Sequence, residues 1–223
     1  MAFARDNATH PVAMSAPAEL QRQFGEIDIY VFDQLLRGRI APGQRILDAG
    51  CGEGRNLVYL IREGFDVHGI DKSPRSIAQI RELAVRLEPS IAVDRFTVQP
   101  IELMSFTDSE FDVVLSSAVL HFARDEADWW EMVREMWRVL APGGMLFARL
   151  ASTIGHETRV QPLGNRRYIV PDGSERFLVD EDFLMTATTE LGGQLIDPLK
   201  TTVVQAMRSM TTWVVRKPGS RSS

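Results

Sequence analysis

The stretch ILDAGCGEGRN, residues 46–56, decides how the rest of the sequence is interpreted. A short apolar run ends at Asp48, and glycines follow at alternate positions, at Gly50, Gly52 and Gly54. A glycine-rich turn between a strand and a helix lets backbone N–H groups approach a ligand, because no Cβ atom stands in the way. The spacing differs from the G-x-G-x-x-G pattern of dinucleotide folds, and the turn lacks the G-K-[ST] ending of a phosphate-binding loop.

Strand and helix patterns alternate on both sides of this turn. Apolar runs typical of buried strands occur at 45–50, 65–71, 95–99, 111–120 and 145–150. Amphipathic helix patterns lie between them, at 54–63, after Ser73–Pro74 and after the capping residue Asp125. Strands that alternate with helices at this spacing run parallel and are joined by crossover helices. The sequence therefore predicts an α/β fold.

The C-terminal part of the chain has a different pattern. A short helix is predicted over 179–191, and residues 194–205 and 210–217 resemble two strands joined by a short loop. We expect an antiparallel pair at the sheet edge. The complete prediction is a doubly wound, mostly parallel, seven-stranded sheet with an antiparallel C-terminal strand pair, which is a Rossmann-like fold.

The predicted domain organisation has three parts. Residues 1–40 form an N-terminal extension and a cap, with one or two amphipathic helices between 18 and 39. Residues 41–217 form the ligand-binding domain, and its polar, irregular segment 151–178 is predicted to be a substrate lid. Residues 218–223 are a tail.

Composition excludes several classes of protein. The chain has 223 residues, a net charge of -5 and no run of basic residues interleaved with aromatic ones, so no nucleic-acid partner is expected. It has neither a signal-peptide pattern nor an apolar run long enough to cross a membrane, so a cytoplasmic protein without membrane contact is expected. The single cysteine and the four histidines show no metal-ligand spacing, and no metal is predicted. Monomer and homodimer remain open.

Two carboxylates indicate what the glycine turn binds. Asp48 lies two residues ahead of Gly50, where a carboxylate would repel a pyrophosphate but attract an ammonium group. Asp71 ends the second predicted strand, 21 residues after Gly50, where a carboxylate can accept both hydroxyls of a ribose. A ligand with a ribose, a positive amino group and no phosphate fits this pattern, and S-adenosylmethionine has all three properties.

The ordered motifs resemble those of a known family. Residues 46–74 resemble the first two motifs of class I S-adenosylmethionine-dependent methyltransferases. Residues 105–122 resemble their later motifs, and residues 136–150 their fifth-strand segment. The resemblance covers roughly residues 44–150. GEGRN, at 52–56, is similar to the small-molecule branch that includes tellurite-resistance and thiopurine-type methyltransferases.

The resemblance implies a set of residues that contact the cofactor S-adenosylmethionine. These are Asp48, Gly50, Cys51 and Gly52 for the methionine part, Arg55 and Asn56 on the first helical turn, Asp71 for the ribose, Lys72 and Ile101 beside the adenine, and Ser116 and Ser117 near the sulfonium. Many relatives carry Gly-Asp where this chain has Gln99 and Pro100, and that aspartate receives the adenine amino group. Here Gln99, a backbone carbonyl or Glu102 must take its place.

A second set of residues is predicted on the acceptor side. His121 follows the fourth strand and is a candidate general base, although a polar wall or a packed residue fits the same pattern. Arg55 is a second catalytic candidate, through pairing with a carboxylate of cofactor or substrate. Tyr30, Arg149 and Arg167 are candidate substrate-binding residues, the arginines for an acidic substrate.

The function predicted from these patterns is in-line transfer of a methyl group from S-adenosylmethionine to a small-molecule acceptor. Two alternatives stay open. One is a protein that binds S-adenosylmethionine or S-adenosylhomocysteine without turnover, and the other is an NAD-dependent oxidoreductase. The glycine spacing and the expected antiparallel strand pair both disfavour the oxidoreductase.

Overall fold

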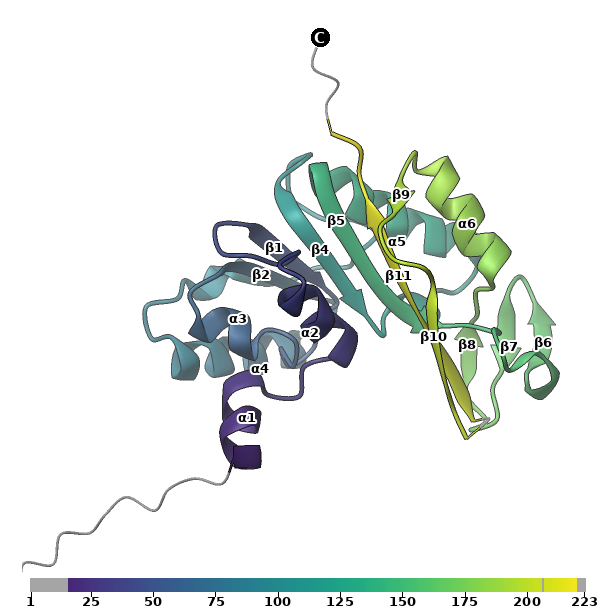
Figure 1. The fold of residues 1–223 in the computed structure, drawn as a ribbon, viewed down its shortest axis with the longest axis horizontal. Coiled ribbons are helices and arrows are strands. Elements are labelled where there is room, and N and C mark those ends of the chain that lie inside the picture. The colour runs from purple at the N-terminus through teal and green to yellow at the C-terminus, as the bar shows by residue number, and fades with distance from the viewer. Residues whose placement is uncertain (1–15, 206, 220–223) are drawn as a thin grey trace, which may run out of the picture.

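A single mixed β-sheet forms the centre of the computed structural model, which describes residues 16–205 and 207–219 (Figure 1). The strand order is β10-β11-β5-β4-β1-β2-β3, and the two-residue strand β9 pairs with β11. The strands are β1 Arg45–Ala49, β2 Asp66–Asp71, β3 Phe96–Val98, β4 Phe111–Ser117, β5 Leu140–Ala151, β9 Gln194–Leu195, β10 Lys200–Val204 and β11 Arg208–Arg216. Strands β1 to β5 pair in parallel, whereas β11 pairs antiparallel with β5, β9 and β10. The predicted fold class is confirmed, although the strand predicted over 194–205 is divided into β9 and β10.

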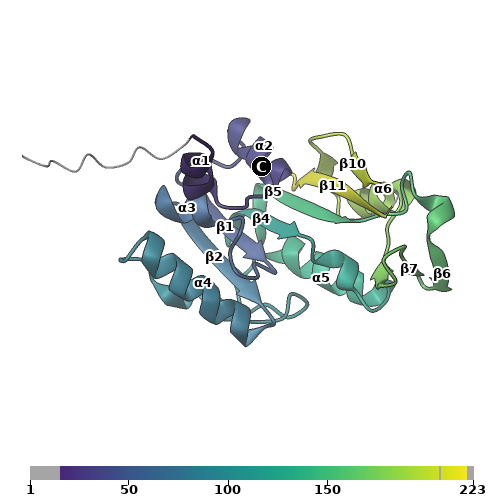
Figure 2. The ribbon, with the colours of Figure 1, turned by 90° about the horizontal axis from the view of Figure 1, so that it is seen from below.

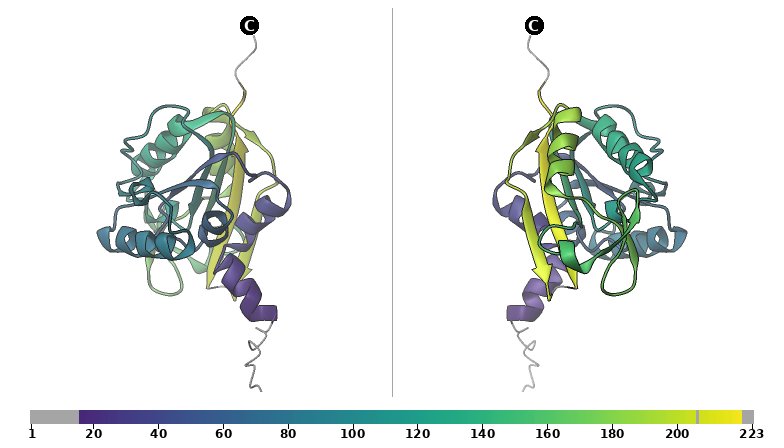
Figure 3. Two further views of the ribbon diagram at one scale, coloured as in Figure 1. Left: turned by 90° about the vertical axis from the view of Figure 1, so that its left-hand side faces the viewer. Right: turned by 90° about the vertical axis from the view of Figure 1, so that its right-hand side faces the viewer.

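Helices cover both faces of this sheet (Figures 2 and 3). On one face lie α2 Ile29–Leu36, α3 Val58–Arg62 and α4 Pro74–Leu87, and α1 Ala16–Phe24 packs against α3. On the other face lie α5 Glu126–Val139 and α6 Glu181–Glu190. Consecutive strand residues point to opposite faces, so Ile46 and Leu47 belong to different hydrophobic clusters.

The aromatic side chains of α5 are central to the second cluster. Trp129 is fully buried, and its ring lies 4.7 Å from that of Phe183 on α6 and 6.0 Å from that of Trp213 on β11. Truncating such a residue to alanine costs about 3–5 kcal/mol, because it removes apolar contacts and leaves a cavity. The predicted packing of this helix face against the sheet is confirmed, although Trp137 is only partly buried.

Acidic and hydroxyl side chains begin four of the helices. Asp28, Ser73, Asp125 and Asp180 accept hydrogen bonds from the first backbone N–H groups of α2, α4, α5 and α6. A cap of this kind contributes about 1 kcal/mol, because it satisfies an N–H group that has no partner inside the helix. The predicted caps at Ser73 and Asp125 are confirmed.

The segment predicted to be irregular is partly regular. It contains a second, three-stranded antiparallel sheet of β6 Gln161–Gly164, β7 Arg167–Ile169 and β8 Glu175–Phe177. Asn165 and Arg166 both have positive φ and form the two-residue turn between β6 and β7. Such a turn usually contains glycine as its second residue, so Asn-Arg gave no hairpin signal.

Several boundaries differ from the prediction, and two predicted segments are only partly described. Strand β5 begins at Leu140 rather than 145, because residues 141–144 continue the strand after helix α5 ends. The helix predicted from residue 54 begins at Val58. Residues 1–15 of the predicted extension and 220–223 of the predicted tail lie outside the described residues.

Candidate active site

A cavity of about 370 Å³ lies at the carboxyl ends of β1, β2 and β4. We call it the glycine cavity. It is lined by Gly50, Gly52, Asp71, Lys72, Gln99, Pro100, Ile101, Glu102, Ser117, Ala118, Val119, Phe122, Arg124, Asp128 and Met132. This is the edge at which open parallel sheets bind ligands, because the loops that follow successive strands meet there.

The three glycines of the turn have different surroundings. A Cβ atom on Gly54 would lie 1.9 Å from Cδ1 of Ile80, and one on Gly50 would lie 2.5 Å from Cγ2 of Val119. A Cβ atom on Gly52 would meet nothing within 4 Å. Gly50 and Gly54 therefore allow close packing within the protein, whereas Gly52 leaves open space on the cavity side of the turn.

Asp71 connects the turn to the second strand. Its carboxylate accepts the N–H of Gly52 at 3.1 Å and the N–H of Ser73 at 2.8 Å. Each carboxylate oxygen has further acceptor capacity, and the residue lines the cavity. Asp71 thus orders the loop and presents acceptors to a ligand.

Asp48 is a buried carboxylate beside this turn. Neither of its oxygens has a hydrogen-bond partner among the described residues. Burial raises the pKa of Asp48 to about 7, with a further contribution from the charge of Asp71 and an opposing one from Arg55. A buried carboxylate without a partner is unfavourable, and a nearby cation from a ligand would relieve it. Asp48 does not itself line the cavity.

The adenine side of the predicted site has one uncommitted carboxylate. Gln99 donates to the Thr97 hydroxyl at 2.7 Å and accepts the N–H of Ser105 at 2.8 Å, so both ends of its amide are used within the loop. Glu102 lines the cavity and makes no hydrogen bond or ion pair within the described part of the chain. Of the two side chains predicted to replace the missing aspartate, Glu102 is the one with uncommitted acceptor atoms in the described part of the chain, and the replacement itself stays a prediction.

A second cavity, of about 360 Å³, adjoins the first. We call it the arginine cavity. It is lined by Arg55, Ala118, His121, Arg149, Ala151, Ser152, His156, Val170, Asp172, Ser174, Arg176, Leu178, Val204, Arg208, Ser209 and Met210. Ala118 lines both cavities, and Arg55 donates to the hydroxyl of Ser117 at 3.0 Å. The two cavities therefore meet at the end of β4.

A buried aspartate organises this junction. The carboxylate of Asp28 accepts from Arg149 at 3.0 Å and from the Ser117 hydroxyl at 3.2 Å, and Arg55 lies 3.7 Å away. The N–H of Asp28 donates to Oδ1 of Asn56 at 3.0 Å. Sequence reasoning missed Asp28, because its only signal, a position just before a helix, indicates a cap. The side chain of Asn56 holds the start of α2, and its predicted contact with the cofactor stays a prediction.

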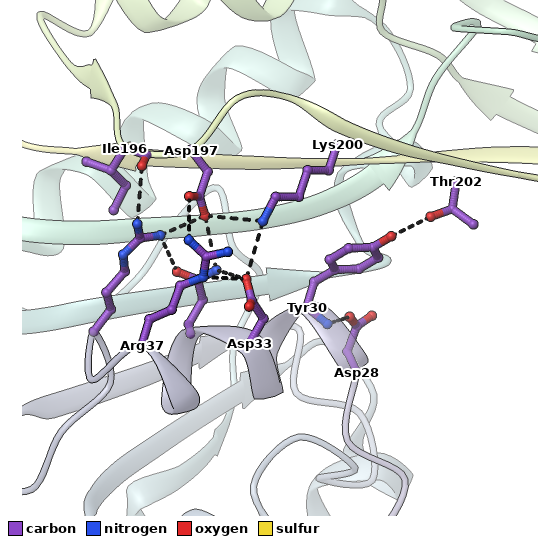
Figure 4. A network of polar contacts seen from close by, with 10 residues as sticks. Asp28, Tyr30, Asp33, Arg37, Ile196, Asp197, Lys200 and Thr202 are labelled. Carbon is purple, nitrogen blue, oxygen red and sulfur yellow. Dashed lines mark hydrogen bonds and ion pairs between the residues drawn. The ribbon is translucent and has the colours of Figure 1, made fainter.

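Helix α2 is fixed to the C-terminal strands by a polar network (Figure 4). Asp197 accepts from Arg39 at 2.7 Å, and Lys200 lies 3.3 Å from Asp33. Burial raises the pKa of Asp197, but hydrogen bonds from Arg39 and Gln34 lower it by more, so that this pKa lies below its ordinary value. We call this network, together with the Tyr30–Thr202 hydrogen bond of 2.7 Å, the α2 anchor.

Two histidines face the arginine cavity. His121 is buried, and burial together with the charge of Arg176 lowers its pKa to about 4. Its imidazole is therefore neutral at neutral pH and a weak base. His156 is also buried, and neither of its ring nitrogens has a partner among the described residues. Sequence reasoning missed His156, Arg176 and Arg208, which lie in irregular or hairpin segments without a motif.

Besides Asp48 and Asn56, four further predicted residues line neither cavity. Cys51 and Ser116 are buried, and burial raises the pKa of the Cys51 thiol far above the range of a reactive thiolate. Tyr30 belongs to the α2 anchor and lies under the guanidinium of Arg149. Arg167 donates to the Ala123 carbonyl at 2.8 Å and pairs with Glu175. Tyr30 and Arg167 thus lie outside both cavities, and their contact with substrate stays a prediction.

Comparison with known proteins agrees with this arrangement. Residues 47–148 match a family model described as a methyltransferase domain. An uncharacterized methyltransferase of Synechocystis sp. is 33% identical over 106 residues, which are 48% of this chain and 46% of the relative. A ubiquinone biosynthesis O-methyltransferase of Methylocella silvestris is 38% identical over 118 residues, which are 51% of this chain and 44% of the relative. The matched part spans less than half of these relatives.

Solved structures share the fold. An S-adenosylmethionine-dependent methyltransferase of Methanosarcina mazei has a TM-score of 0.67 at 21% identity, covering 83% of this chain and 98% of its own. Magnesium protoporphyrin IX methyltransferase of Synechocystis has a TM-score of 0.63 at 17% identity, and the match covers 85% of this chain and 77% of that methyltransferase. Residues 47–148 thus resemble a methyltransferase domain, and these structures show that the chain shares the fold of S-adenosylmethionine-dependent methyltransferases. Within the described residues, every helix is too short or too polar to cross a lipid bilayer.

Proposed function

We propose that the chain transfers a methyl group from S-adenosylmethionine in the glycine cavity to a small-molecule acceptor in the arginine cavity. The observation that carries this proposal is the junction at Ala118, where two cavities of similar volume meet. In-line transfer needs two ligands placed end to end, and the structure offers adjoining spaces for them. A protein that only held the cofactor would have no use for the second cavity.

The residues of the glycine cavity fit the proposed cofactor. Asp71 offers acceptors for the ribose hydroxyls, and the open space at Gly52 accommodates the methionine part. The buried, unpartnered carboxylate of Asp48 favours a cationic group nearby, as the α-ammonium would be. Lys72 and Ile101 would flank the adenine, and Glu102 would accept its amino group.

The chain contributes chiefly alignment. The bound cofactor supplies a methyl group already activated by a positive sulfur, so the nucleophile needs mainly a dry and well-oriented approach. Ser117 and Ala118 form the wall at which the two ligands would touch, and Arg55 holds Ser117 in place. Such positioning contributes several kcal/mol, roughly 7–11 in the most favourable cases. The neutral imidazole of His121 can accept a hydrogen bond from the acceptor, and its lowered pKa makes it a weak base.

The predicted lid also takes part. Val170, Asp172, Ser174, Arg176 and Leu178 all come from the segment 151–178 and line the arginine cavity. This supports a role for the segment in enclosing the acceptor.

The motif GEGRN, residues 52–56, is similar to the tellurite-resistance and thiopurine-type branch of methyltransferases. This likeness supports the part of the proposal that the acceptor is a small molecule.

Calorimetric titration tests the proposed function. The protein is titrated with S-adenosylmethionine, S-adenosylhomocysteine and NADH, and the Asp71→Ala variant with the same ligands. We expect the first two to bind, NADH not to bind, and Asp71→Ala to weaken binding at least a hundredfold. Asp66→Ala, at the opposite end of the same strand, is the matched control and should bind normally. Binding of NADH alone would overturn the proposal.

A further inference from the structure

We propose that the acceptor carries an oxyanion, a carboxylate or a phosphate group, on an apolar body, and that Arg176 and Arg208 bind this oxyanion at the outer end of the arginine cavity. The inference rests on the proposed function, because it specifies the acceptor of the same site. It follows from the charge, the position and the burial of the residues that line the cavity.

The charge of the cavity is opposite to that of the chain. The chain has a net charge of -5, yet four arginines and one carboxylate, Asp172, line the cavity. Asp28 neutralises part of the charge of Arg149 and lies near Arg55. Arg176 and Arg208 form no ion pair within the described residues, although Arg176 stacks on the Phe122 ring and donates to the Glu175 carbonyl, and the charge of Asp172 lies near both arginines. Guanidinium groups bind carboxylates and phosphates through two parallel hydrogen bonds. These two arginines are therefore available to an anionic ligand.

Strand register places Arg208 away from the junction. On β11, Thr212 pairs with Arg149 and Met210 pairs with Ala151, so Arg208 lies four residues beyond the level of Arg149. At about 3.3 Å per residue this is a distance of about 13 Å along the strand. Arg208 begins β11 at the hairpin that extends toward β8, the strand of Arg176 (Figure 1). An oxyanion bound there leaves the other end of the acceptor near Ala118.

Apolar side chains line the path between these ends. Ala151, Val170 and Leu178 form a small hydrophobic cluster with Met210, and all four line the cavity. They would contact an apolar body several carbon atoms long. His156 provides a second, independent sign of a ligand, because it is 2% exposed, lines the cavity and has both ring nitrogens unpartnered among the described residues. Buried polar groups are normally hydrogen-bonded, so a polar group from outside the chain is expected beside this histidine.

The test compares charged probes with an uncharged one of the same shape. The probes are 4-phenylbutyrate, 3-phenylpropyl phosphate and 4-phenylbutanamide, which share the phenylpropyl body. They are titrated at 150 mM salt in the presence of saturating S-adenosylhomocysteine and followed by ligand-observed NMR. We expect at least one acid to bind tenfold or more tightly than the amide. Whichever acid binds more tightly identifies the group as a carboxylate or a phosphate.

Variants show whether the arginines are responsible. Arg176→Gln and Arg208→Gln should each weaken binding of the acid about tenfold or more, while leaving the affinity for the amide unchanged. Arg86→Gln, at an exposed arginine on α4, is the control and should leave all affinities unchanged. An amide that binds as tightly as the acids, or acids that bind equally to the variants, would overturn the inference.

The affinity for S-adenosylhomocysteine separates the two proposals. It is measured for the original chain and for each variant in the same experiment. If S-adenosylhomocysteine binds and the acids do not, the oxyanion inference fails and the proposed function stands. If S-adenosylhomocysteine does not bind to the original chain, the proposed function itself fails.

Discussion

The glycine cavity and the arginine cavity have similar volumes and share Ala118, yet they are built in different ways. The residues of the glycine cavity come from one continuous stretch, Gly50 to Met132, and follow the ends of parallel strands. Those of the arginine cavity range from Arg55 to Met210 and include the second sheet and the β10–β11 hairpin. The first cavity therefore follows from the fold, whereas the second depends on segments attached to it.

The largest expected contrast is in the pH dependence of stability. Asp48, beside the glycine cavity, has a pKa of about 7 instead of 3.8, so the folded state binds more protons and loses stability as the pH rises from about 4 to 7. At about 1.4 kcal/mol per pKa unit, this amounts to about 4 kcal/mol. His121, in the arginine cavity, has a pKa of about 4 instead of 6.5, so its contribution of about 3 kcal/mol is lost as the pH falls from about 6.5 to 4.

Urea unfolding between pH 4.5 and 7.5 measures both effects. As the pH rises, the free energy of unfolding of Asp48→Asn should increase relative to that of the original chain. As the pH falls, the free energy of unfolding of His121→Phe should increase relative to that of the original chain. If the unfolding free energy of Asp48→Asn depends on pH in the same way as that of the original chain, the pKa of Asp48 is not raised in the folded state.

The second prediction separates packing from ligand space within one turn. Gly54→Ala places a methyl group against Ile80 at a φ of +86°, and we expect it to cost about 3 kcal/mol of unfolding free energy. Gly52→Ala meets open space, so its cost is about 1 kcal/mol from backbone strain, while binding of S-adenosylhomocysteine weakens about tenfold. Thermal unfolding and titration of both variants check this. Equal loss of stability would contradict the assignment of Gly52 to the ligand.

The sequence alone predicts that Asp71 and Gly52 lie together, and both line the glycine cavity. This much is predictable because strand ends and glycine spacing are local features that recur in order along the chain. The same reasoning could not assign separate roles to Gly52 and Gly54, because the contact with Ile80 is tertiary. Arg176 and Arg208 gave no signal, since their role depends on a hairpin and a second sheet that meet only after folding.

The third prediction concerns the buried charge at the junction. Asp28→Asn keeps a side chain that can cap α2 but removes the negative charge beside Arg149. We expect the variant to lose about 2 kcal/mol of stability, because a partly buried arginine loses its partner. The arginine cavity also becomes more positive, so 4-phenylbutyrate should bind severalfold more tightly. Unfolding and probe titration measure the two effects, and weaker binding of the acid would mean that Asp28 supports the cavity mainly by shape.

The smallest effect is expected at the adenine end of the glycine cavity. Glu102→Gln should weaken S-adenosylhomocysteine binding about fivefold to tenfold, because a charge-assisted hydrogen bond of about 1–1.5 kcal/mol is reduced. Gln99→Ala is the comparison. It should alter the conformation of the loop but weaken S-adenosylhomocysteine binding less than Glu102→Gln does, since both ends of the Gln99 amide bind within the loop. Calorimetry with S-adenosylhomocysteine distinguishes them. A larger loss for Gln99→Ala would reverse the assignment.

The α2 anchor has a consequence for the order in which the molecule becomes complete during synthesis. The residues that line the glycine cavity have all been added once Met132 is in place. Helix α2, which carries Asp28 at its start, gains its partners Asp197 and Lys200 much later, and the arginine cavity is complete only at Met210. At about 5–20 residues per second, the ribosome needs on the order of ten seconds for this interval. A nascent chain thus contains every residue that lines the glycine cavity before it contains all of those that line the arginine cavity.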